Sequence, residues 1–111
     1  MAAMAVFNRE VALERVGGDE ELLAEIVGIY LGEYPSVLEE IQTAVRAGDA
    51  NGLYRSAHSL KGSLGALGAE AAQKSAMDLE MSGRQSQLSH APEMLADLER
   101  LLDELRGELS T

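Results

Sequence analysis

The fold of this chain is decided by residues 57–68, which read AHSLKGSLGALG. An α-helix turns about 100° per residue, so apolar residues spaced alternately by four and three share one face. A stripe of this kind runs through the stretch and the turn before it: Leu53, Ala57, Leu60, Leu64 and Leu67. The spacing predicts a helix from about residue 50 to residue 67, with this stripe packed in a hydrophobic core.

The opposite face of the same helix carries His58. Its direction lies roughly 140° from the centre of the apolar stripe, whereas Gly62 lies at about 180°, Gly65 at about 120° and Lys61 at about 80°. A glycine inside a helix costs about 0.5–1 kcal/mol relative to alanine. Two glycines beside an exposed histidine therefore indicate a surface that a large partner approaches closely.

The composition limits the class of protein. The chain has 111 residues and no cysteine, which favours one domain and leaves no disulfide or thiolate metal site. Nineteen acidic residues against nine basic ones give a formal charge of −10, which argues against nucleic acid and membrane surfaces as partners. No apolar run approaches the roughly 20 residues of a membrane span. We expect a cytoplasmic protein.

Five helices are predicted from capping residues, helix stops and apolar periodicity. Their approximate ranges are residues 9–16, 20–46, 50–67, 69–83 and 90–109. Short turns join the long helices, so neighbouring helices should run antiparallel. The predicted fold is all-α, an antiparallel up-down four-helix bundle with a short N-terminal capping helix. We expect residues 1–6 to be a disordered leader or a cloning remnant, and residues 7–111 to form the domain.

Two positions make the helix prediction specific. Pro35 interrupts the second helix, but the apolar period continues past it, which favours one bent helix. Ser89 is the expected N-cap of the last helix, with Pro92 in its first turn.

The hexapeptide HSLKGS at 58–63, followed by Gly65 and Gly68, resembles the signature of histidine-containing phosphotransfer (HPt) domains. These domains are the phosphocarriers of two-component phosphorelays. The likeness extends to GGD at 17–19, YP at 34–35 and AGD at 47–49, and it covers about residues 7–109.

The resemblance implies a role for each matched residue. His58 would accept a phosphoryl group from a receiver-domain aspartate and pass it to another, with Lys61 as the cation near that group. Gly62 and Gly65 would let the receiver dock closely. The implied partners are response-regulator receiver domains, with a hybrid sensor histidine kinase as a further candidate. No cofactor is implied in this chain, because Mg²⁺ belongs to the receiver.

Three further residues are assigned to the docking surface from their positions on the same helix. Tyr54 and Arg55 flank His58 about one turn earlier, and Asn51 lies near the same face. The chain has no nucleotide-binding glycine motif and no room for an ATP-dependent kinase domain, so it is expected to act as a phosphocarrier rather than as an enzyme. A kinase dimerisation segment is also missing, which favours a monomer.

The main alternative is an acidic helical bundle that binds partner helices without chemistry. A hydrolase using His58 with Ser59 or Ser63 is disfavoured, because neighbouring helical positions diverge and no orienting carboxylate lies nearby in sequence. Two histidines without clustered carboxylates match no metal-ligand spacing.

One residue departs from the family pattern. Leu64 stands where family members usually carry a small residue. Its angle places it in the core, and we hypothesise that Gly28 or Gly32 on the second helix supplies the space it needs.

Overall fold

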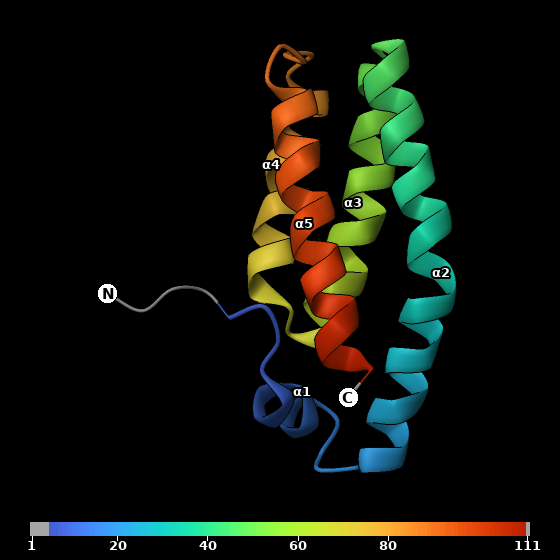
Figure 1. The fold of residues 1–111 in the computed structure, drawn as a ribbon, viewed down its shortest axis with the longest axis vertical. Helices are drawn as coiled ribbons and strands as arrows, with labels where there is room; N and C mark the ends of the chain where they lie inside the picture. The colour runs from blue at the N-terminus through green and yellow to red at the C-terminus, as the bar shows by residue number, and fades with distance from the viewer. Residues whose placement is uncertain (1–4, 111) are drawn as a thin grey trace.

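The computed structural model describes residues 5–110 and contains five helices in that range, with no strand among the residues it describes (Figure 1). They are α1 (Arg9–Arg15), α2 (Glu20–Ala47), α3 (Ala50–Leu67), α4 (Glu70–Arg84) and α5 (Ala91–Leu109). The four long helices lie side by side, and α1 lies at one end of the molecule (Figure 1). The all-helical class predicted from the sequence is confirmed.

Short polar side chains begin the first three helices. Each accepts a hydrogen bond from a backbone N–H three residues later: Asn8 from Val11 at 3.2 Å, Asp19 from Leu22 at 3.0 Å and Asp49 from Gly52 at 2.9 Å. Glycines in the left-handed conformation end α2 and α3, with φ of 68° at Gly48 and 71° at Gly68. These local signals account for the close match between predicted and observed helix limits.

The second helix continues through Pro35 as one helix, as the uninterrupted apolar period predicted. The N-cap predicted for α5 is wrong. Ser89 and His90 form a turn in which the Ala91 N–H donates to the Leu88 carbonyl at 3.1 Å. The helix therefore starts at Ala91, and the N-cap position is His90, whose side chain makes no capping hydrogen bond.

The apolar stripe of α3 lies in the core. Its five members are at most 1% exposed, and Leu64 is completely buried, as its angle predicted. The hypothesis that Gly28 or Gly32 makes room for Leu64 is wrong. Both glycines are exposed, and a Cβ added to either would meet nothing within 4 Å. Small buried residues lie instead on α4, the helix that packs most extensively against α3: Ala72 and Ala76.

The N-terminal residues are described only in part. The leader expected at residues 1–6 lies mostly outside the described residues. Within them, the Ala5 carbonyl accepts from the Ala71 N–H at 3.3 Å, and Val6 packs against the core.

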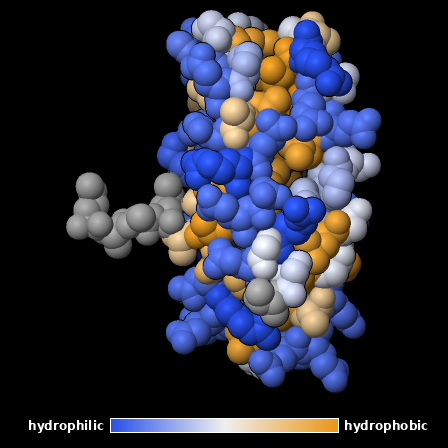
Figure 2. Space-filling view, viewed as in Figure 1, coloured by the Kyte–Doolittle hydropathy of each residue, from blue (hydrophilic) through white to orange (hydrophobic). Residues whose placement is uncertain are grey.

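The surface follows the composition. Hydrophilic residues cover much of the face shown in Figure 2, and hydrophobic residues are visible between them. Across residues 5–110, no helix has both the length and the apolar character needed to cross a membrane.

Candidate functional site

His58 projects from the middle of α3, on the side opposite the buried stripe. Its side chain is 61% exposed, whereas its neighbour Ala57 is fully buried. The helix thus fixes the imidazole at the surface by burying the residues beside it, as the sequence predicted. A histidine at this place can meet a partner without any rearrangement of the core.

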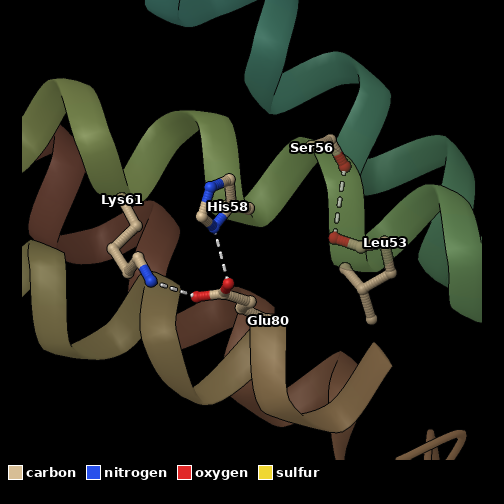
Figure 3. A network of polar contacts seen from close by, with 5 residues as sticks. All are labelled: Leu53, Ser56, His58, Lys61 and Glu80. Atoms are coloured by element: carbon tan, nitrogen blue, oxygen red, sulfur yellow. Dashed lines mark hydrogen bonds and ion pairs between the residues drawn. The ribbon is translucent and has the colours of Figure 1, made fainter. Parts of the chain in front are cut away.

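One carboxylate from α4 contacts both functional candidates of α3 (Figure 3). Glu80 Oε2 lies 2.7 Å from His58 Nδ1, and Glu80 Oε1 lies 2.6 Å from the Lys61 ammonium. The Lys61 contact is an ion pair with a carboxylate that is almost fully buried. Each oxygen has its own partner, so His58 and Lys61 are held at the same time.

The Glu80 side chain is only 8% exposed, yet it is charged. Burial by itself raises the pKa of this carboxyl, because it disfavours the ionised form. Contacts with Lys61 and His58 outweigh burial and hold the pKa below the ordinary glutamate value. Glu80 is therefore ionised near neutral pH and acts only as an acceptor.

The position of Glu80 depends on a close approach of two helices. A Cβ added to Gly83 would lie 2.6 Å from the Tyr54 nitrogen and 2.7 Å from the Ala50 oxygen, both atoms of the α3 backbone. No side chain larger than hydrogen fits there without moving a helix. Gly83 follows Glu80 by one turn, so it lets α4 come near enough for the carboxylate to reach His58.

The contact with Glu80 determines which imidazole nitrogen is available. Because the carboxylate can only accept, Nδ1 carries the proton and donates it. In the neutral ring the lone pair then belongs to Nε2, which points away from Glu80 (Figure 3). The arrangement presents a nucleophilic nitrogen toward solvent.

Lys61 and the two glycines occupy different surroundings. The Lys61 side chain is 28% exposed and turns toward α4. Gly62 is exposed, and a Cβ added there would meet nothing within 4 Å. Gly65 is half-buried: an added Cβ would lie 2.7 Å from the Gln73 side chain, and its carbonyl accepts from the Arg15 guanidinium of α1.

The remaining predicted surface residues divide between two sides of α3. Tyr54 is half-buried, and its ring stacks on that of His58 with centroids 6.2 Å apart. Asn51 is exposed and lines a groove with Tyr54 and Gly83. Arg55 is also exposed, but it lines a different groove, between α2 and α3. The five predicted docking residues therefore do not form one continuous patch beside His58.

Glu80 is the residue that sequence analysis missed. Its partner lies 22 positions away, so no local motif contains both residues. A signal was nevertheless present, because Ala72, Ala76, Glu80 and Gly83 recur at helical spacing on one face of α4. A glutamate in an otherwise small and apolar stripe is rarely buried without a partner. Within residues 5–110, no group of three or more His, Cys, Asp or Glu residues could hold a metal ion.

Comparisons with known proteins bear on the family and the fold of the chain. The family model of the Hpt domain matches residues 25–108. No curated protein matches the sequence. A solved structure, histidine-containing phosphotransfer protein B (HptB) from Pseudomonas aeruginosa PAO1, superposes with a TM-score of 0.88 at 24% identity, covering 97% of this chain and 94% of that chain.

The chain belongs to the Hpt domain family, because the family model spans most of its length. Its role is histidine phosphotransfer in a phosphorelay. Hpt domains work with response-regulator receiver domains and kinases in two-component systems, and the family is generally non-enzymatic. The structural likeness adds that the helices are arranged as in HptB.

Proposed function

We propose that His58 is the phosphoacceptor of this Hpt domain and that Nε2 is its nucleophilic atom. The observation that carries the proposal is the 2.7 Å contact of Nδ1 with Glu80, on a side chain that is 61% exposed. Nδ1 donates to the Glu80 carboxylate, and Nε2 is left with its lone pair toward solvent. A receiver aspartyl phosphate can approach that nitrogen directly.

The chain supplies a positioned nucleophile, and the receiver domain supplies the rest of the chemistry. In the forward step Nε2 attacks the phosphorus of a receiver phosphoaspartate, and the aspartate carboxylate leaves with the bonding electrons. In the second step another receiver aspartate removes the phosphoryl group. Mg²⁺ is expected on the receiver.

Lys61 is proposed as the cation beside the phosphoryl group. Its ammonium and the His58 ring contact the same carboxylate, which keeps the two side chains close together. A phosphoryl group on Nε2 adds negative charge that a lysine at this position can offset. The gain is up to about 1 kcal/mol, because the side chain is partly exposed to solvent.

Gly62 is the best-supported residue of the proposed docking surface. Among residues 5–110, nothing lies within 4 Å of a Cβ added to Gly62, so internal packing does not account for a glycine there. A receiver that must bring its aspartate close to His58 does account for it. Gly65, Tyr54 and Asn51 are proposed as further docking residues, with Gln73 covering part of Gly65. Arg55 is proposed as a docking residue on the α2 side of α3.

The finer architecture is part of the same proposal. Helices α2 to α5 form an antiparallel up-down bundle, and α1 caps one end of it. Connections of two residues between α2 and α3 and between α3 and α4 support this arrangement, as does the bond from Arg15 to the Gly65 carbonyl. We also propose a domain over residues 7–111 that is monomeric and cytoplasmic and binds neither nucleic acid nor membranes, in keeping with a charge of −10.

The experiment is transfer from receiver domains charged with acetyl phosphate to the purified chain. Wild type is expected to gain an acid-labile, base-stable label, and His58→Gln is expected to gain none. His90→Gln is the matched control, because it removes the other histidine and should be labelled like wild type. Label that persists in His58→Gln, or that disappears in His90→Gln alone, would show that the assignment is wrong.

A further inference from the structure

Glu80 lies where a carboxylate is costly. It occupies the apolar stripe of α4, with a side chain that is 8% exposed. A buried charge needs partners, and Glu80 has two, both of them residues proposed to take part in phosphotransfer. A glutamate that served only packing could be replaced by an apolar residue of similar size. Its contacts therefore point to a role in the reaction.

The electron balance of the transfer shows what that role can be. When Nε2 attacks phosphorus, the ring keeps the proton on Nδ1 and becomes a positively charged phosphoimidazolium. When the N–P bond later breaks, its electron pair returns to Nε2, and the ring leaves as neutral imidazole. If Nδ1 has lost its proton in between, the ring must leave as an imidazolate anion, which is a far poorer leaving group. The Nδ1 proton thus decides how readily phosphohistidine gives up its phosphoryl group.

We propose that Glu80 is a positioning residue that retains the Nδ1 proton of His58 while Nε2 carries the phosphoryl group, and so keeps the phosphohistidine a reactive donor. The inference rests on the proposed function of His58. The contact of 2.7 Å places a carboxylate where it stabilises the cationic ring more than the neutral one. No proton has to move during either transfer step.

The surroundings of the pair are simple. Both charged partners of Glu80, His58 and Lys61, come from α3, and no group of α2 or α5 among the described residues shifts its ionisation. Tyr54, stacked on the imidazole, is a further titratable neighbour of His58. Lys61 uses Oε1 and His58 uses Oε2, so Lys61 can turn toward a phosphoryl group without removing the acceptor of Nδ1.

The test uses the phosphorylated chain as donor and measures its transfer rate to one receiver over a range of pH. Glu80→Gln keeps the size of the side chain and removes its charge. We expect the ratio of variant to wild-type rate to lie within about threefold of unity near pH 6. The ratio should fall about tenfold per pH unit once the variant's ring has lost its proton. Using a ratio at each pH cancels the receiver's own pH dependence.

Asp78→Asn is the matched control. It removes a carboxylate from the same helix that pairs with Lys74 at the surface, and its rate ratio should stay flat with pH. A ratio for Glu80→Gln that is lowered equally at every pH would indicate structural damage and overturn the proposal, as would a ratio of one throughout.

A second measurement does not depend on a variant. Nitrogen-15 NMR of the phosphorylated wild type is expected to find Nδ1 protonated at about pH 8, well above the pKa of about 6.5 at which an unperturbed histidine ring loses its proton. An unprotonated Nδ1 would overturn the proposal even if phosphorylation is normal. Failure of the proposed function is distinct, because His58 of wild type would then gain no label at all.

Discussion

The chain contains two histidines, and each places Nδ1 against a glutamate, yet the two pairs differ in distance, in the burial of the glutamate and in the segments that carry them. His58 and Glu80 lie 2.7 Å apart and belong to different helices. His90 and Glu93 lie 3.4 Å apart and are separated by three positions of one chain segment. The Glu80 side chain is 8% exposed and the Glu93 side chain 78%.

The difference is the physical basis of the role proposed for His58. At His90 both side chains are free to rotate in water, where screening leaves a surface ion pair with little energy and no fixed geometry. At His58 the carboxylate is buried where α4 packs on α3, so Nδ1 contacts a partner that burial holds in place, and Nε2 is left toward solvent. Burial of the partner supplies this orientation, and the His–Glu contact alone does not.

The largest expected effect comes from separating the two helices that make the buried pair. Gly83→Ala places a methyl group about where the α3 backbone already lies, 2.6 Å from the Tyr54 nitrogen. We expect the free energy of unfolding to fall by about 1–3 kcal/mol, measured by urea denaturation. Transfer to His58 should also slow, because α4 carries Glu80 away from the ring.

The control for this change is Gly107→Ala on α5. That glycine is exposed within a helix and has open space around it, so alanine should raise stability by about 0.5–1 kcal/mol. If Gly83→Ala were as stable as Gly107→Ala, the close approach of α3 and α4 could not be what holds Glu80 in place.

A second change leaves the buried pair intact and alters only the surface beside it. Gly62→Gln puts a long side chain on the open face one turn after His58. We expect transfer from a receiver to fall about tenfold or more, equivalent to at least about 1.4 kcal/mol, without loss of stability. Gly32→Gln is the control, because Gly32 is equally open but lies on α2. Equal transfer in both variants would remove Gly62 from the docking surface.

Most of the fold could be predicted from the sequence because its signals are local. Asn8, Asp19 and Asp49 cap the helices they precede, and Gly48 and Gly68 end the ones they follow. Ser89 failed as a cap because it lies in the turn at 89–90, so α5 begins at Ala91, one residue later than a Ser89 cap requires.

Only the part of the candidate site that lies on α3 could be predicted from the sequence. His58 and Lys61 share one helix with the motif, so their angles follow from position alone. Glu80 and Gly83 act through contacts across to another helix, and their meaning depends on how α4 lies against α3. The sequence shows a charged residue in the apolar stripe of α4, but it does not show which residues of α3 this charge contacts.

The buried pair should also be visible in the acid stability of the protein. The pKa of Glu80 is lowered in the folded state, despite burial, by Lys61 and His58, so its ionised form contributes stability above the ordinary glutamate pKa. That contribution is lost as pH falls through the folded-state value. Glu80→Gln should therefore be less stable than wild type near neutral pH and approach it in acid, as measured by urea unfolding across pH. Curves that stay parallel down to about pH 3 would contradict the assignment.

The smallest change in stability is expected for the exposed His90–Glu93 pair, which serves as the reference for the other variants. Glu93→Gln removes a carboxylate that is 78% exposed and 3.4 Å from His90 Nδ1. Its charge also lies in the first turn of α5, where a helix dipole favours an acidic side chain slightly. Both contributions are screened by water, so the free energy of unfolding should change by less than about 0.5 kcal/mol and transfer should not change. A loss as large as that of Glu80→Gln would mean that exposure does not separate the two pairs. The orientation of His58 would then need a cause other than the burial of its partner.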